Sequence, residues 1–248
     1  MHILLAAATT AEIRPTIDFL LKTSVSRAGE ANAPTSTPAV IPLPGPHCVS
    51  IIITGIGSVA TTWTLMQSIG TDRPDLMIQA GIAGCLTCRN AGETVVIRDE
   101  SFADLGVWED GRFKSPFELG LADPDAQPFS AGRLPNPWSK LIALTGLEPV
   151  EAITINEIST HPERIRWLQQ NSPAVVESME GAALHYVGRR EAIPFIQLRS
   201  VSNAIGIRDK SKWNMPLAIG NLNDHLIRLL ESLAAAGNIF QPRKRENL

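Results

Sequence analysis

Three polar side chains each stand within four residues after an apolar, strand-like run: Glu12, Glu180 and Asn203. A carboxylate can take a proton from water or hold a sugar hydroxyl, and an amide both donates and accepts hydrogen bonds. Such a set suits acid–base chemistry on a small polar ligand. Each residue also has a plain structural reading, because acids are favoured in the first turn of a helix and Asn is common in turns.

The runs that must position these side chains alternate between strand-like and helix-like patterns. Strands are expected at 2–8, 48–54, 76–84, 93–99, 150–156, 174–179 and 193–199, and helices at 11–22, 137–146, 161–171, 179–191 and 215–235, with a turn and a helix at 55–70. Strands separated by helices form a largely parallel sheet that is covered on both faces. The sequence therefore predicts an α/β fold, a single three-layer α/β/α domain with a mixed, mainly parallel central sheet.

In such a sheet, ligands bind outside the carboxyl ends of the strands. The residues that follow the predicted strands are therefore the candidate site. They are Thr9 to Glu12, Gly55 to Ser58, Gly81 to Gly84, Ile155 to Glu157, Met179 to Glu180, and Ser202 to Asn203. Glu12, Glu180 and Asn203 all fall in this set, which favours a functional reading of the three together.

The chain divides into one domain and a tail. Residues 1–236 are expected to form the domain. Within it, residues 24–46 contain five prolines and predict a surface excursion, and the polar stretch 100–136 predicts an insertion or lid. Residues 237–248 carry the basic cluster Arg243-Lys244-Arg245, which we interpret as part of a solvated tail.

Composition excludes several classes of function. The 248 residues are 44% hydrophobic and 19% charged, with a net charge of −3, which is typical of a globular protein and argues against a nucleic-acid partner. No apolar run approaches the roughly 18 residues of a membrane span. The N-terminal MHILLAAATTAEIRP lacks the positive start of a secretion signal and is read as a buried strand. An odd number of cysteines, three, predicts a reducing cytoplasm.

Two motifs point weakly to cofactors. GIGSVA at 55–60 matches the dinucleotide fingerprint G-x-G-x-x-G/A, but the next strand carries no acid to hold a ribose. Cys85 and Cys88 have C-x-x-C spacing without a second pair, so a zinc site is not expected. We expect neither a metal nor an organic cofactor.

Five stretches, in this order, resemble the nucleoside phosphorylase and nucleosidase family: AEI after the first strand, TGIGSVAT, QAGIAGCL, VESMEGAAL and RSVSNAIG. The resemblance implies that Glu12 holds and deprotonates an attacking water. It implies that Met179 and Glu180 contact the sugar, with the Glu180 carboxylate on the 2′-hydroxyl. It further implies substrate contacts for Ala83 and Gly84 through the backbone, Ile155 and Asn156 beside the base, and Trp213 near the 5′ substituent.

Asn203 carries the specificity prediction. Family members that act on methylthioadenosine and adenosylhomocysteine usually have Asp at this position. An amide can donate to a 6-oxo group but cannot act as the acid, so Asn favours hypoxanthine or guanine over adenine. The source of a proton for N7 is left open. The stretch SNAIGIRDKSKW resembles members that hydrolyse a 6-oxopurine nucleoside. An anionic 5′ substituent would need a cation or N–H donors, and the candidates for them are Arg208 and the 100–136 segment.

We therefore predict hydrolysis of the N-glycosidic bond of a purine nucleoside with release of hypoxanthine. Three alternatives stay open: a nucleosidase for 6-aminopurines, a 6-oxopurine nucleoside phosphorylase, and a nucleoside-binding protein without activity. A phosphorylase needs arginines for an anion, and neither TGIGSVAT nor the loop from Ile82 to Cys88 contains one. The resemblance also implies a homo-oligomer.

Overall fold

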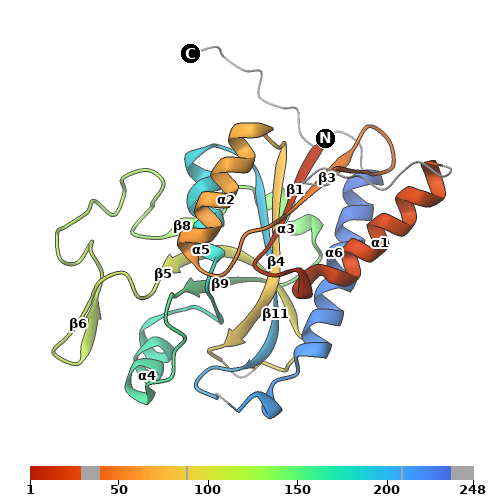
Figure 1. Ribbon diagram of the computed structural model, residues 1–248. Helices are drawn as coiled ribbons and strands as arrows, with labels where there is room; N and C mark the ends of the chain where they lie inside the picture. Colours follow the sequence, from red (N-terminus) through yellow and green to blue (C-terminus); the bar gives the residue numbers. More distant parts are fainter. Residues whose placement is uncertain (29–39, 88, 208, 236–248) are drawn as a thin grey trace.

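The computed structural model describes residues 1–28, 40–87, 89–207 and 209–235 (Figure 1). The elements are, in order, β1 (His2–Ala7), α1 (Thr10–Ala28), β2 (Val40–Pro42), β3 (Cys48–Ile53), α2 (Ser58–Thr71), β4 (Leu76–Cys85), β5 (Thr94–Phe102), β6 (Val107–Glu109), β7 (Arg112–Lys114), β8 (Leu134–Pro135), α3 (Ser139–Leu144), β9 (Pro149–Thr154), α4 (Pro162–Asn171), β10 (Val176–Ser178), α5 (Gly181–Arg190), β11 (Phe195–Ala204), a 3₁₀ turn (Lys210–Lys212) and α6 (Met215–Ala235).

The strands form one mixed sheet in the order β10-β9-β5-β11-β4-β1-β3-β2, with β8 paired to β5. One block, β3-β1-β4-β11, is parallel, and a second block, β5-β9-β10, is parallel within itself. The two blocks meet antiparallel at β5 and β11, and β10 pairs antiparallel with the end of β4. Because β10 pairs with both β9 and β4, five strands close into a small barrel at one end of the sheet.

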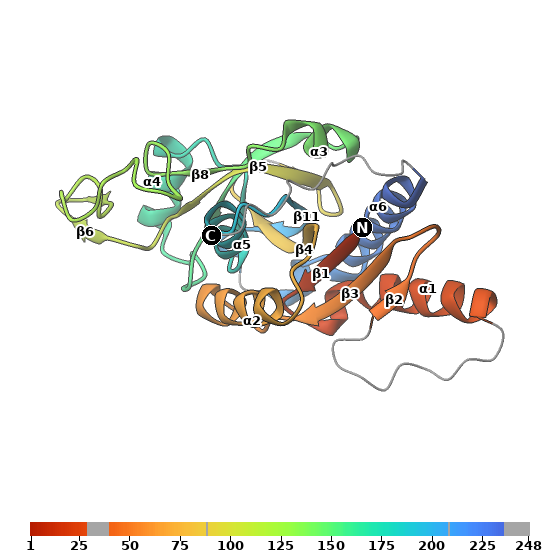
Figure 2. The same cartoon turned by 90° about the horizontal axis from the view of Figure 1, so that it is seen from above.

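Helices cover both faces of the sheet, which confirms the predicted α/β/α layering. Helices α1 and α6 lie side by side on one face, and α2 and α5 on the other (Figures 1 and 2). The first face buries Ile13, Leu20, Leu222 and Leu226 against β1 and β4, and the second buries Leu65 and Leu184 among their neighbours. A third apolar cluster, which includes Ala83, Val95 and Val176, fills the barrel.

Some predicted boundaries differ from the structure. The last strand, expected at 193–199, continues to Ala204, because β11 pairs with β4 along its whole length. Asn203 therefore lies in a strand and not in a loop. The expected insertion at 100–136 contains the β6–β7 hairpin, which projects from the body at the left of Figure 1. Residues 29–39 of the proline-rich stretch and 236–248 of the tail lie outside the described residues.

In the part of the chain that the structure describes, no helix combines the length and the hydropathy that a bilayer crossing requires.

Candidate active site

Glu12 lies in the first turn of α1, directly after β1, and its side chain is buried. The backbone N–H and the hydroxyl of Thr9 both donate to its Oε2 at 3.0 Å. The N–H of Ile82, on β4, donates to its Oε1 at 3.1 Å. Three donors from two elements fix this carboxylate where β1 ends beside the middle of β4.

Glu180 is the N-cap residue of α5, but its carboxylate makes no capping hydrogen bond. The Gly57 N–H, in the turn between β3 and α2, donates to its Oε1 at 3.1 Å. Gly57 has a φ of 92°, a conformation that favours glycine. The glycine turn that the sequence offered as a dinucleotide motif therefore serves here to bring a backbone donor to Glu180.

Arg199 completes the centre of the site, and sequence reasoning missed it. It projects from β11, is 1% exposed, and places Nη2 3.6 Å from Glu180 Oε2. The same nitrogen donates to Gln79 Oε1 at 2.9 Å. A Cβ added to Gly81 would lie 2.3 Å from Arg199 Nη1 and 2.9 Å from Glu12 Oε1. Glu12 and the guanidinium thus meet over Gly81, where no side chain fits, and the guanidinium also reaches Glu180.

Asn203 lies farther along β11, at a β-bulge between Val201 and Asn203. The bulge sets Asn203 opposite Gly84 of β4. The Ser202 hydroxyl donates to Asn203 Oδ1 at 2.7 Å, and Asn203 Nδ2 donates to the Ala204 carbonyl at 2.9 Å. The Ser202 contact orients the amide, so that Nδ2 keeps one hydrogen for a ligand and Oδ1 keeps one lone pair.

Three more predicted residues border the same region. Met179 is half-buried, and its carbonyl accepts from the Ser58 hydroxyl at 3.3 Å. The Asn156 backbone N–H and amide donate to Asp104, and Asn156 Oδ1 is 3.9 Å from where a Gly57 side chain would begin. Ala83 is buried, and its carbonyl lies 3.2 Å from the Ser202 hydroxyl.

One predicted residue, Ile155, does not present its side chain to this centre. Ile155 is fully buried in the core cluster that also contains Leu86 and Leu168, so its side chain packs inside the protein. Trp213 is half-buried, and its indole N–H donates to the Ile207 carbonyl at 2.8 Å. Arg208 lies outside the described residues.

Glu177, which the sequence did not single out, lies on the other side of Gly84 from Asn203. It is 5% exposed and pairs with Gly84 across β10 and β4. The Ser159 N–H donates to its Oε1 at 3.2 Å, and burial raises the pKa of this carboxyl. Glu177 and Asn203 are therefore the two polar neighbours of Gly84 in the sheet.

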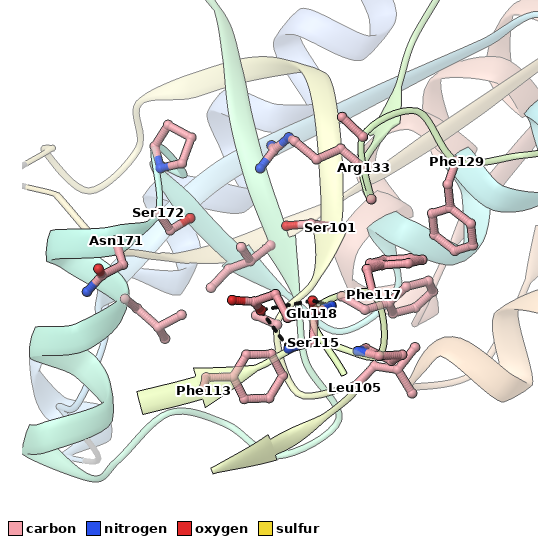
Figure 3. Close-up of a pocket in the computed structure, with 18 of the residues that line it drawn as sticks. Ser101, Leu105, Phe113, Ser115, Phe117, Glu118, Phe129, Arg133, Asn171 and Ser172 are labelled. Carbon is pink, nitrogen blue, oxygen red and sulfur yellow. Dashed lines mark hydrogen bonds between the residues drawn. The ribbon is translucent and has the colours of Figure 1, made fainter. Parts of the chain in front are cut away.

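A separate cavity of about 300 Å³ lies between the end of β5, the hairpin segment and α4 (Figure 3). Aromatic rings dominate its wall, and Glu118 accepts the Ser115 N–H and hydroxyl beside it. Its cation, Arg133, is already paired with Asp99 at 2.8 Å and Glu151 at 3.1 Å. None of the predicted site residues that the structure describes lines this cavity.

Among the described residues, no three His, Cys, Asp or Glu side chains are grouped as a metal site would require. Cys88, half of the C-x-x-C pair, is outside them.

The fold is a mixed sheet with a barrel at one end, and its candidate site has two buried carboxylates around a buried arginine. The chain belongs to the Phosphorylase superfamily, whose family model matches residues 3–231. It is 27% identical over 254 residues to the futalosine hydrolase of Streptomyces coelicolor, covering 99% of this chain and 100% of that protein. It is 30% identical over 179 residues to the futalosine hydrolase of Thermus thermophilus, covering 71% of this chain and 79% of that protein.

The fold has close counterparts among solved structures. One is the 5′-methylthioadenosine/S-adenosylhomocysteine nucleosidase of Colwellia psychrerythraea in complex with adenine, with a TM-score of 0.74. The match covers 94% of this chain and 96% of that chain at 18% identity, and so concerns the fold alone.

Proposed function

We propose that the protein is a nucleosidase that hydrolyses the N-glycosidic bond of futalosine, releasing hypoxanthine and dehypoxanthine futalosine for menaquinone biosynthesis. The observation that carries this proposal is the buried Arg199, which lies beside both Glu12 and Glu180, in a chain similar to futalosine hydrolases. The stretch SNAIGIRDKSKW, which contains Asn203, resembles the same enzymes.

The two carboxylates suit two needs of this reaction, which are stabilisation of a cationic ribose and activation of a water. Breaking the bond builds positive charge on the ribose and negative charge on the departing base, and catalysis requires interactions that strengthen as those charges grow. Glu180 binds the 2′-hydroxyl and stabilises the cationic ribose. Glu12 holds a water on the opposite face of the ring and takes its proton as the water attacks C1′.

Arg199 supports water over phosphate as the nucleophile. Its guanidinium is fully buried and already serves Gln79 and Glu180, with Glu12 beside it. Two carboxylates against one cation leave the centre net negative, which disfavours binding of a phosphate anion. A phosphorylase would need further cations here, so we rank hydrolysis first.

Asn203 supports a 6-oxopurine as the base. With Oδ1 held by Ser202, the remaining Nδ2 hydrogen can be donated to O6 of hypoxanthine. A 6-amino group in the place of O6 would present a donor to this Nδ2 donor, and a mismatched buried hydrogen bond typically costs about 1–3 kcal/mol. The Asn203 amide itself cannot protonate N7.

We also propose that the protein is a homo-oligomer of the cytoplasm. Ile56, Val59, Trp63 and Met66 form an apolar stripe on and before α2 and are 63%, 83%, 65% and 39% exposed. Their spacing puts them on one helix face, and such a patch on a globular protein marks an interaction surface. Because Gly57 lies between Ile56 and the helix, a second copy on this stripe would border the site. The odd number of cysteines supports the location.

The proposal is tested by incubating the purified protein with futalosine and, separately, with methylthioadenosine, and measuring the released base by chromatography. We expect hypoxanthine from futalosine at a kcat/KM well above that for adenine from methylthioadenosine. Preferential release of adenine would assign the protein to the 6-amino nucleosidases instead.

A further inference from the structure

Four polar side chains that the proposed reaction does not use are buried together behind Glu180. Glu100 on β5, Thr154 on β9, His185 on α5 and Gln197 on β11 are each 0% exposed. The Gln197 Nε2 donates to Glu100 Oε1 at 2.9 Å, and the Thr154 hydroxyl donates to Glu100 Oε2 at 3.0 Å. A carboxyl group so deep in the protein is costly unless it is neutral or fully compensated.

This cluster packs against Gly181 at the start of α5, one residue beyond Glu180. A Cβ on Gly181 would lie 1.9 Å from Glu100 Oε1 and 2.3 Å from Gln197 Nε2, so only glycine fits there. The Thr154 hydroxyl, while donating to Glu100, accepts from the Ala182 N–H at 2.8 Å. Glu100 thereby fixes the orientation of the hydroxyl that receives a free N–H of the first helical turn.

Because other groups cap α5, the Glu180 carboxylate is not needed as a cap. The side chain of an N-cap residue usually accepts from the N–H groups of the first turn. Here Thr154 accepts from Ala182, and the Ser178 hydroxyl accepts from Gly181 at 3.3 Å. Glu180 makes no capping bond, and its carboxylate turns instead to Gly57 and Arg199.

The hydrogen bonds of the cluster reveal which form Glu100 takes. His185 Nδ1 lies 2.7 Å from the Leu134 carbonyl and must carry the hydrogen, so Nε2 is a bare acceptor. His185 Nε2 and Gln197 Oε1 are both buried without a partner, although the two side chains are in contact. Two facing acceptors cannot satisfy each other.

One rearrangement gives a hydrogen-bond partner to the facing polar atoms of Glu100, Gln197 and His185. The oxygen and nitrogen of a Gln amide are interchangeable in placement. If Gln197 is turned over and Glu100 carries a proton, Glu100 donates to Gln197 Oε1, Gln197 Nε2 donates to His185 Nε2, and His185 donates to Leu134. The neutral acid still accepts from Thr154 through its other oxygen.

We infer that, below neutral pH, Glu100 is protonated in the folded protein and acts as a positioning residue for Glu180, by orienting the Thr154 hydroxyl that caps α5. The link to catalysis rests on the role proposed above for Glu180. Consistent with this geometry, burial raises the pKa of Glu100 to about 7. The charged groups that face it are Arg199 and Arg133, whose positive charges act against the rise, and His185 is neutral because burial lowers its pKa to about 3.

The protonation of Glu100 is tested by thermal unfolding of wild type and Glu100→Gln, which keeps one donor and one acceptor but does not titrate. A pKa raised in the fold means that the stabilising contribution of this carboxyl is complete below its ordinary value of 4.5 and is lost as pH rises through about 7. Glu100→Gln should therefore gain Tm relative to wild type between about pH 5 and about pH 8. The matched surface change Glu231→Gln should show no such trend. A constant Tm difference between wild type and Glu100→Gln would overturn the protonated state.

The positioning role is tested with Thr154→Val, which removes the hydroxyl, and Thr154→Ser, which restores it. We expect Thr154→Val to speed amide hydrogen exchange at Ala182 and to lower kcat/KM about tenfold or more, as misplacement of a binding group does, with Thr154→Ser close to wild type. Wild-type kcat/KM and exchange in Thr154→Val would refute the role. Absence of hydrolysis by wild type would instead refute the proposed function, because the melting and exchange experiments need no substrate.

Discussion

The Nη2 atom of Arg199 lies 3.6 Å from the Oε2 atom of Glu180, in a pair of side chains that are 1% and 7% exposed. The same guanidinium stands beside Glu12 above Gly81. One buried cation therefore lies beside both the carboxylate that would bind the ribose and the carboxylate that would activate water. A nucleosidase site built this way depends on Arg199 for both its stability and its chemistry.

Replacing Arg199 with Met, which is apolar and of comparable length, should leave two buried carboxylates without their cation. Removal of one partner of a buried ion pair typically costs about 3–5 kcal/mol, so we expect a marked fall in the free energy of unfolding and in kcat/KM. Arg199→Lys should have values between those of wild type and Arg199→Met, because Lys keeps the positive charge and lacks the planar guanidinium. Chemical denaturation measures the free energy of unfolding, and steady-state kinetics measures kcat/KM. Arg166→Met, at an exposed position on α4, is the control. An Arg199→Met protein as stable and active as wild type would contradict the shared-cation account.

Changing Asn203 to Asp should move the base preference. A carboxylate accepts from a 6-amino group and repels a 6-oxo group, and each matched or mismatched buried hydrogen bond is worth about 1–3 kcal/mol. We expect the ratio of kcat/KM for hypoxanthine release to that for adenine release to fall about ten- to hundredfold. Asn171→Asp, on the exposed end of α4, should leave the ratio unchanged. An unaltered ratio in Asn203→Asp would mean that Asn203 does not read the 6-position.

Glu12→Gln should separate chemistry from binding. The amide keeps an acceptor for the Ile82 N–H but cannot take a proton from water. Loss of general-base assistance should slow hydrolysis roughly 10²–10⁴-fold while calorimetry still detects the substrate bound. The protein is a nucleoside binder, and our assignment of Glu12 is wrong, if wild type and Glu12→Gln bind alike and neither turns over.

His185 should make the fold sensitive to acid. Burial lowers the pKa of this His from its ordinary value of 6.5 to about 3. Between pH 6.5 and about pH 3, His185 is therefore protonated in the unfolded chain and neutral in the folded protein. The contribution of neutral His185 is therefore complete above 6.5 and is lost as pH falls toward about 3. Urea unfolding across this range should show a shallower acid slope in His185→Gln than in wild type. His161→Gln, at an exposed position, should keep the wild-type slope. Equal slopes in all three proteins would contradict the buried neutral form.

The exposed stripe on α2 should govern assembly. Trp63→Glu places a charge in the middle of the proposed contact and should shift the mass measured by light scattering toward that of one chain. Leu121→Glu, at an equally exposed apolar position in the segment between β7 and β8, should not. A wild-type protein that is monomeric at high concentration would refute this contact.

The sequence proposed Glu12 and Glu180 because both follow strands, and ligands bind at the carboxyl ends of the strands in a parallel sheet. The structure brings Glu180 beside Arg199 for a reason that the sequence does not contain. Its strand, β10, runs against β4, and this antiparallel return carries Glu180 from the far end of β4 back toward Gly81. Pairings between residues so distant in the chain leave no periodic signal in either strand.

Sequence reasoning missed Arg199 for a related reason. The sequence does show that Arg199 is a charged residue within the apolar run of β11, on the same face as Gln197. A buried charge requires partners, but the strand pattern alone does not name Glu180 or Gln79. Those partners depend on the register between β4 and β11, which pairs Arg199 with Gly81.

Ile155 shows the converse case, a predicted site residue whose side chain lies in the core. It follows β9 directly and so entered the candidate set, yet its side chain is buried in the apolar cluster beneath α4. Position after a strand places a backbone at the site, but the strand's local direction and twist decide which way the side chain faces.

The measurement that tests the central claim most directly is the release of hypoxanthine from futalosine by the wild-type protein in phosphate-free buffer. The account predicts stoichiometric release of hypoxanthine and dehypoxanthine futalosine at a rate that added phosphate does not raise. No release, or release only when phosphate is added with formation of a ribosyl phosphate, would contradict it.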